Sequence, residues 1–107
     1  MLDGVSILVA DDEEIMREIL HELLVQEGYE VRLASSGSEG LDICRSVTFD
    51  AAIVDIMMPD MDGISVLDEL KRLDEQLPVL MITAFASVEN AIASMKRGAF
   101  DYFTKPC

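Results

Sequence analysis

The sequence is short of cysteine, histidine and basic residues. Its 107 residues include two cysteines and one histidine, and 21 acidic residues outnumber 8 basic ones, which gives a net charge of −13. Two thiols without a CxxC spacing do not predict a disulfide framework, and they are typical of a reducing, cytoplasmic setting. Because an acidic surface repels phosphate backbones, we expect that this chain does not bind nucleic acid directly.

Long apolar runs are also missing. No segment approaches the roughly 20 apolar residues of a membrane span, and the N-terminus lacks the basic and apolar regions of a signal peptide. We therefore expect a cytoplasmic protein that does not enter a membrane. Hydrophobic residues still make up 50% of the chain, which is enough to build one compact core, and the length is too short for a second domain.

Short apolar runs alternate with helical patterns along the whole chain. Predicted strands cover residues 5–10, 29–34, 51–56, 78–83 and 100–104, and predicted helices cover 13–27, 36–47, 64–73 and, after an N-cap at residue 87, 88–97. Strands that are separated by single helices predict a parallel, right-handed α/β sheet. In such a sheet a functional site lies beyond the carboxyl ends of the strands.

Polar side chains stand at the ends of four of these predicted strands. Asp11 and Asp12 follow the first strand, and Asp55 ends the third. Thr83 ends the fourth strand, and Lys105 follows the fifth. Because the carboxyl ends of parallel strands meet at one edge of the sheet, we expect these five side chains to converge there.

This set of side chains favours phosphoryl chemistry. Clustered carboxylates repel one another, and a hard cation with oxygen ligands, Mg²⁺, would remove that cost. A carboxylate that faces a metal-bound phosphoryl group can attack it and form an aspartyl-phosphate. Lys105 would then provide a second positive charge for the phosphate, and Thr83 a hydrogen-bond donor.

Five motifs, in order over nearly the whole chain, resemble the receiver domain of bacterial two-component response regulators. They are VADDE at 9–13, AAIVD at 51–55, MPDMDG at 58–63, TA at 83–84 and KP at 105–106. The resemblance implies a flavodoxin-like, doubly wound sheet of five parallel strands in the order 2-1-3-4-5. It also implies that residues 1–107 are a single receiver domain. Segments 83–91 and 98–103 are similar to receivers of nitrogen-regulation and dicarboxylate-transport regulators.

The resemblance implies a role for each acidic residue of the site. Asp55 would be the phosphoacceptor, and Asp12 a direct ligand of Mg²⁺. Asp11 would bind the ion through water, and Met57 through its backbone carbonyl.

Further residues are implied to respond to the phosphoryl group. Thr83 and Lys105 would be the phosphate-sensing pair, and Tyr102 the aromatic switch that turns inward when the threonine moves. The bond between Lys105 and Pro106 is usually cis in the family.

The family resemblance implies a signalling switch that is not a conventional enzyme. A sensor histidine kinase would phosphorylate Asp55, and the changed surface would control an output domain, such as an AAA+ domain in transcription regulation. The chain would catalyse only its own phosphorylation and dephosphorylation. In the family, the residue two positions after the phosphoacceptor and the residue two positions after the threonine flank the route of attacking water. Here they are the bulky Met57 and Phe85, so we expect slow loss of the phosphate.

Two functions from other classes compete with this interpretation. A pseudo-receiver that binds partners without accepting phosphate would not need the full set of site residues. A small phosphatase with an aspartyl-phosphate intermediate usually has a second acid two residues after the nucleophile, where this chain has Met57. Nucleotide binding is a weaker alternative, because no glycine-rich phosphate loop follows any predicted strand.

Each site residue also has an interpretation without function. Asp11 and Asp12 can act only as acids at a helix N-terminus. Thr83 can be an ordinary β-branched strand residue, and Tyr102 an ordinary half-buried one. We expect the single histidine, His21, on a solvated helix face, and the methionines near residue 57 to be packing and loop residues.

The family has a fifth helix after the lysine–proline pair, whereas this sequence ends at Cys107. Because a parallel sheet needs cover on both faces, we expect a chain truncated before its last helix. Apolar residues from the first, fourth and fifth strands would then be exposed on one face. Exposed apolar patches favour association, so we expect a homodimer or a loss of stability.

Overall fold

The computed structural model describes residues 4–105. The strands are β1 (Ser6–Ala10), β2 (Glu30–Ala34), β3 (Ala51–Asp55), β4 (Val79–Thr83) and β5 (Asp101–Thr104). The helices are α1 (Glu14–Gln26), α2 (Gly37–Ser46), α3 (Gly63–Leu73) and α4 (Val88–Lys96). Every predicted element is confirmed, with ends that differ by no more than one residue. Several boundaries carry a local signal, such as the N-caps Ser36 and Ser87 or the glycines Gly28 and Gly98.

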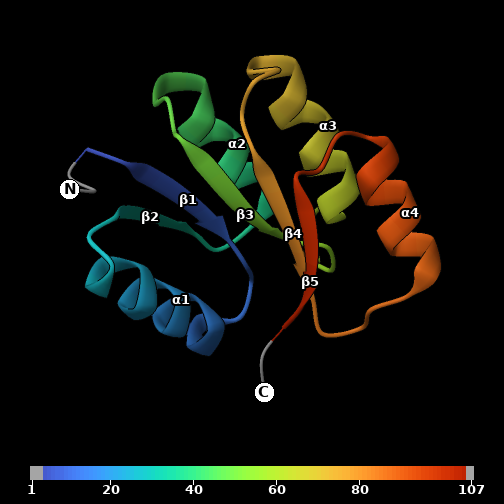
Figure 1. Cartoon of the computed structure of the whole chain (residues 1–107), viewed down its shortest axis with the longest axis horizontal. Coiled ribbons are helices and arrows are strands. Elements are labelled where there is room, and N and C mark those ends of the chain that lie inside the picture. Colours follow the sequence, from blue (N-terminus) through green and yellow to red (C-terminus); the bar gives the residue numbers. More distant parts are fainter. Residues whose placement is uncertain (1–3, 106–107) are drawn as a thin grey trace.

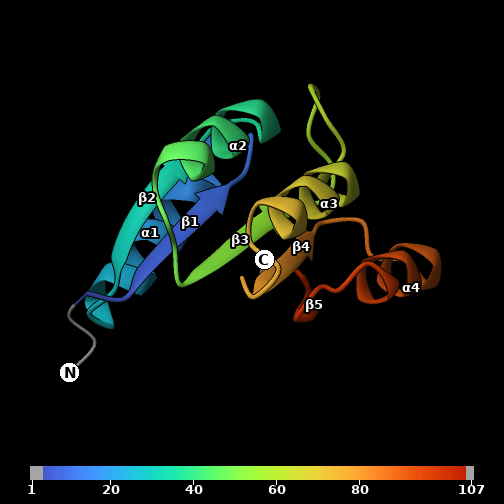
Figure 2. The same ribbon diagram turned by 90° about the horizontal axis from the view of Figure 1, so that it is seen from above.

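The five strands form one parallel sheet in the order β2-β1-β3-β4-β5. The predicted doubly wound sheet and its strand order are therefore confirmed. Helix α1 lies on one face, and α2, α3 and α4 follow one another across the other (Figures 1 and 2). All arrowheads in Figure 1 point to the same edge of the sheet, so the residues that follow each strand share that edge.

The hydrophobic core lies between the sheet and the helices α2 and α3. We use the name apolar core for five of its fully buried members, from β1, β3, β4 and α3: Leu8, Val54, Met81, Leu67 and Leu70. Helix α3 provides two of these side chains from the face that looks onto the sheet. The core thus fixes α3, and with it the loop that joins α3 to the end of β3.

The opposite face is covered by α1 alone within the described residues. Met16 and Leu20 of α1 line a hollow with Leu80 and Phe103 of the sheet, and Phe103 is exposed. Helix α1 itself exposes four large apolar side chains, those of Ile15, Ile19, Leu23 and Val25. The predicted exposure agrees with this arrangement for strand five, where Phe103 is exposed, but it is wrong for strands one and four, because no apolar side chain of β1 or β4 is exposed.

Strand β1 escapes exposure because the helix that follows it folds back over it. Ile7 and Val9, on the α1 side of the sheet, are both buried. On this side of the molecule the exposed apolar surface therefore belongs to α1 and to Phe103 of β5. Self-association through this surface stays a prediction.

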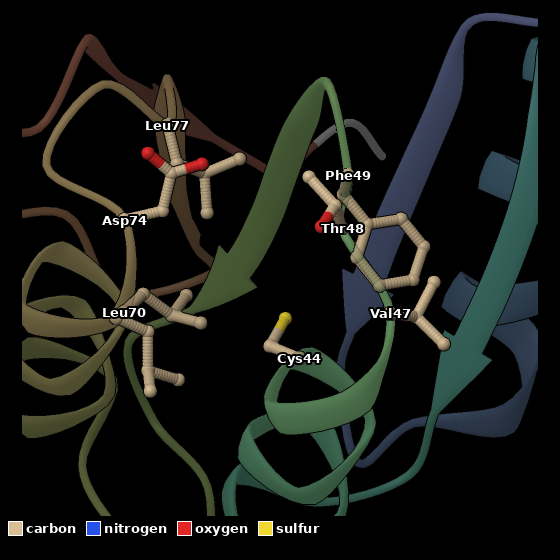
Figure 3. A pocket seen from close by; sticks show the side chains of 8 residues that line it. Cys44, Val47, Thr48, Phe49, Leu70, Asp74 and Leu77 are labelled. Atoms are coloured by element: carbon tan, nitrogen blue, oxygen red, sulfur yellow. The ribbon is translucent and has the colours of Figure 1, made fainter.

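A second hollow, of about 190 Å³, lies between the C-terminal ends of α2 and α3. Figure 3 shows the thiol of Cys44 directed into it, between Leu70 and Phe49. Burial raises the pKa of this thiol, and Cys44 is a free cysteine. The hollow adjoins Thr48 and Phe49, just before β3 begins, so it lies at the edge of the sheet opposite the carboxyl ends of the strands.

No helix in residues 4–105 is both long and apolar enough to cross a membrane.

Candidate metal and phosphoryl site

Three carboxylates meet at the carboxyl edge of the sheet. Asp11 and Asp12 follow β1, Asp55 ends the neighbouring strand β3, and one oxygen of each lies within 4.8 Å of the others. Asp11 is 0% and Asp55 2% exposed, whereas Asp12 is exposed. Oxygen ligands in this number suit a hard divalent cation that keeps part of its water shell.

Asp11 is held by the backbone around it. Its Oδ1 accepts a hydrogen bond from the Glu13 backbone N–H at 2.9 Å, and its carbonyl accepts one from Arg17 Nη1 at 2.8 Å. Helix α1 starts after Glu13, whose own side chain makes no capping bond. Asp11 and Asp12 therefore precede the N-cap, and the geometry does not support the alternative in which they only cap this helix.

The Lys105 ammonium lies inside the group of carboxylates. Its Nζ is 3.0 Å from Asp11 Oδ2 and 3.0 Å from Asp55 Oδ2, and the side chain is only 8% exposed. Glu13 makes a third ion pair with the same ammonium. Burial alone would lower the pKa of Lys105, but the hydrogen bonds to Glu13, Asp55 and Asp11 raise it above its usual value. We use the name polar cluster for Asp11, Asp12, Asp55 and Lys105.

Glu13 is the functional contact that the sequence analysis missed. It is the third acid of the VADDE motif, so the signal was present, but its spacing from Lys105 gave no reason to pair them. The bond between Lys105 and Pro106, expected to be cis, lies outside the described residues.

Asp55 is a buried acid with an unusual pKa. Burial raises it from the ordinary 3.8 to about 6, and the Asp11 charge adds to the rise. Lys105 and the Met57 backbone N–H, which donates to Asp55 Oδ1 at 3.1 Å, oppose it. The charged form is therefore held in a place that disfavours it, and a cation beside it would relieve the cost.

Thr83 and Tyr102 hold the two ends of the loop between β4 and α4. Thr83 is fully buried, and its Oγ1 accepts a hydrogen bond from the Phe85 N–H at 3.0 Å. The hydroxyl hydrogen stays free to donate elsewhere. The Tyr102 hydroxyl accepts a hydrogen bond from the Ser87 N–H at 3.2 Å. A displacement of Thr83 would therefore pull on a segment whose other end is bound to Tyr102.

The loop between β3 and α3 is packed closely against the site. The Gly63 N–H donates to the Ile56 carbonyl at 2.7 Å, and a Cβ on Gly63 would lie 2.2 Å from the Asp55 carbonyl oxygen. Only glycine fits this approach. Met58 is buried and Met61 packs on the core, as predicted for packing residues, while Met57 is exposed.

The single histidine lies where the sequence analysis placed it. His21 is exposed in the middle of α1, and it is absent from the residues that contact Lys105. It therefore takes no part in the polar cluster.

The chain belongs to the family of response regulator receiver domains, whose family model matches residues 7–107. The predicted membership is confirmed. The transcriptional regulatory protein ZraR of Escherichia coli (strain K12) is 45% identical over 104 residues, which are 97% of this chain and 24% of that protein. The chain thus spans much less than two thirds of the length of this curated relative.

Solved structures of the same family share the fold. A response regulator protein from Burkholderia pseudomallei, with a phosphorylated aspartic acid, a calcium ion and citrate, has a TM-score of 0.91 at 31% identity, over 97% of this chain and 61% of that one. TrrA from Thermotoga maritima, in complex with Mg²⁺ and BeF, has a TM-score of 0.87 at 34% identity, over 95% and 87% of the two chains.

The predicted similarity to nitrogen-regulation receivers is also supported. NtrX from Brucella abortus has a TM-score of 0.89 at 33% identity, over 97% of this chain and 24% of that one.

Proposed function

We propose that this chain is the phosphoacceptor switch of a two-component signalling system. A carboxylate oxygen of Asp55 would form a bond to phosphorus, while the bond from phosphorus to the donor breaks and its electron pair leaves with the donor. The donor would be a phosphohistidine of a sensor histidine kinase. The observation that carries the proposal is the polar cluster, in which buried acids from two strands share one ammonium.

The residues present fit a magnesium ion. Asp11, Asp12 and Asp55 would hold it, together with the Met57 backbone carbonyl. Asp11 Oδ2 is buried and accepts no hydrogen bond, and its neighbour is the Lys105 ammonium. An oxygen in that state favours a hard cation. When bound, Mg²⁺ would neutralise charge on the phosphoryl oxygens.

Lys105 and Thr83 would respond to the phosphoryl group. The ammonium is already charged and buried beside Asp55, so it would pair with a phosphoryl oxygen without first being ordered. The Thr83 hydroxyl would donate to a second oxygen. Its movement would disturb the bond with Phe85 and, through Ser87, the contact of Tyr102. The surface of α4 and β5 would therefore change with phosphorylation.

The chain would act as one domain of a longer regulator. It spans 24% of the length of ZraR, and we propose that residues 1–107 are a single receiver domain that controls an output domain, such as an AAA+ domain in transcription regulation. Cytoplasmic location and a histidine kinase partner follow from the same proposal. Its catalysis would be limited to its own phosphorylation and dephosphorylation.

Incubation with acetyl phosphate and Mg²⁺, followed by intact mass measurement, tests the proposal. The wild type should gain the mass of one phosphoryl group, and Asp55→Asn should gain none while it keeps its circular dichroism spectrum. Asp12→Ala should lose the rise in melting temperature that Mg²⁺ gives the wild type. A wild type that gains no phosphate would contradict the proposal and favour the pseudo-receiver. Rapid repeated hydrolysis of acetyl phosphate would favour the phosphatase.

A further inference from the structure

Asp60 ties the loop after Asp55 to a helix from a different part of the chain. Its Oδ1 accepts a hydrogen bond from the Gly37 N–H at 3.1 Å, and its Oδ2 accepts one from the Ser38 N–H at 2.9 Å. Gly37 and Ser38 are the first residues of α2. The N–H groups of Ser38 and Gly37 hold the pKa of Asp60 below its ordinary value, so the carboxylate stays charged.

Helix α2 also has an N-cap of its own. Ser36 is its N-cap, and the Ser36 Oγ accepts a hydrogen bond from the Glu39 N–H at 3.1 Å. Glu39 in turn accepts one from the Ser35 N–H. Ser36 therefore pairs the N–H of Glu39, whereas Asp60 pairs those of Gly37 and Ser38 and also joins two segments that the sequence separates.

The two segments are in close contact at this point. A Cβ on Gly37 would lie 2.8 Å from Val66 Cγ2 and 3.2 Å from Met61 Cβ. The N-terminus of α2 thus rests directly on the loop and on α3. Since Gly63 closes the loop at its base, Asp60 is the charged attachment at its tip.

Between the base and the tip lies the backbone that faces the polar cluster. The Met57 N–H donates to Asp55 Oδ1 at 3.1 Å, and Met57 is three residues before Asp60 with the stiff Pro59 between them. A loop fixed at both ends holds the Met57 backbone in one orientation. A loop released at Asp60 would allow that orientation to vary.

We propose that Asp60 is a positioning residue for the metal site. By binding the loop to α2, Asp60 holds the Met57 backbone in place. This inference rests on the proposed function of the polar cluster as a Mg²⁺ and phosphoryl site. Because coupling between sites is reciprocal, Mg²⁺ would also change the bonds from Asp60 to Gly37 and Ser38.

Asp60→Ala and Ser36→Ala are a matched pair of variants. Both remove a side-chain acceptor from the N-terminus of α2, but only Asp60→Ala frees the loop. Groups that orient metal ligands typically contribute a factor of about 10 or more in metal affinity. Titration calorimetry with MgCl₂ should therefore show about tenfold weaker binding for Asp60→Ala and unchanged binding for Ser36→Ala. Asp60→Asn, which keeps one acceptor oxygen, should fall between them.

A second readout follows the coupling itself. In the wild type, Mg²⁺ should shift the amide NMR signals of Gly37 and Ser38, and in Asp60→Ala these shifts should disappear. In Ser36→Ala they should persist. Equal Mg²⁺ affinity of Asp60→Ala and wild type would overturn the inference, as would equal losses in Asp60→Ala and Ser36→Ala. If the wild type itself binds no Mg²⁺, or if Asp12→Ala binds it equally well, the proposed function fails and the inference with it.

Discussion

The apolar core and the polar cluster are both buried, yet they are held together by opposite means. The core side chains pack between the sheet and α3 with no charge among them. The polar cluster places acids from two strands around one ammonium. The first arrangement is favourable through the removal of apolar surface from water. The second costs free energy unless the charges are matched.

The difference separates the part of the fold that provides stability from the part that responds to pH and to a cation. Packing in the core does not depend on pH or on a cation. The polar cluster depends on both, since the pKa of Asp55 is raised to about 6 by burial and its acids outnumber its lysine. The same strands thus provide a stable frame and, at their carboxyl ends, a region that a cation or a phosphoryl group can change.

A core substitution should give the largest change in stability. Leu70 is fully buried on α3, and Leu70→Ala would remove its packing and leave a cavity, at a cost of about 2–5 kcal/mol in the free energy of unfolding. Urea unfolding with and without Mg²⁺ checks the value. The loss should be the same in both buffers and at every pH between about 5 and 8. A loss that depends on Mg²⁺ would mean that the stability of the core is coupled to the polar cluster.

In the absence of metal, Asp55→Asn should raise the free energy of unfolding, whereas Leu70→Ala lowers it. The pKa of Asp55 in the folded state, about 6, lies above its ordinary 3.8, so the folded state binds the proton more tightly. Stability is therefore lost as pH rises through 6 and regained as pH falls toward 4. With EDTA, the variant should be more stable than the wild type by roughly 2–3 kcal/mol above pH 7 and equal to it near pH 4.

Urea unfolding in EDTA at several pH values measures this difference. Added Mg²⁺ should reverse the order at neutral pH, because it stabilises only the wild type. A variant that is less stable than the wild type at neutral pH without metal would show that the ion pair between Asp55 and Lys105 outweighs the cost of burial.

The sequence was sufficient for the fold and for the residues that meet at its edge. Glycine and N-cap signals bound several elements locally, and a parallel sheet brings the residues at the carboxyl ends of its strands together, as for Asp11 and Asp55. The contacts of Glu13 with Lys105 and of Asp60 with α2 could not be predicted. They depend on side-chain conformations across 92 and 22–23 residues of sequence, for which periodicity carries no signal.

Burial was not predictable from the strand itself, even where the covering element comes next in the chain. The continuous apolar run of β1 does not reveal that α1 returns over Ile7 and Val9. The apolar pattern of α1 likewise predicts a buried stripe, although Ile15 and Leu23 are exposed. A pattern identifies an apolar face, and the packing partner of that face is decided elsewhere in the chain.

Two adjacent methionines allow the same comparison between the apolar core and the polar cluster at single residues. A substitution of Met57 has the smallest expected effect on stability. Met58 is 8% exposed and belongs to the core, whereas Met57 is 55% exposed beside the polar cluster. Met58→Ala should cost about 2 kcal/mol or more. Met57→Asn should change the free energy of unfolding by no more than about 0.5 kcal/mol, since it removes little buried surface.

Met57→Asn should instead alter the lifetime of the phosphorylated state. The wild-type side chain is bulky and apolar and cannot orient water, whereas an amide at this position can hydrogen-bond an attacking water next to the phosphoryl group. We expect the wild type to keep its phosphate for minutes or longer, and the variant to lose it several-fold faster. Intact mass, followed over time after removal of acetyl phosphate, gives both rates, and Met58→Ala is the control for a general loosening of the loop. If Met57→Asn loses phosphate more slowly than the wild type, or if the wild type loses it within seconds, the exposed methionine does not shield the site.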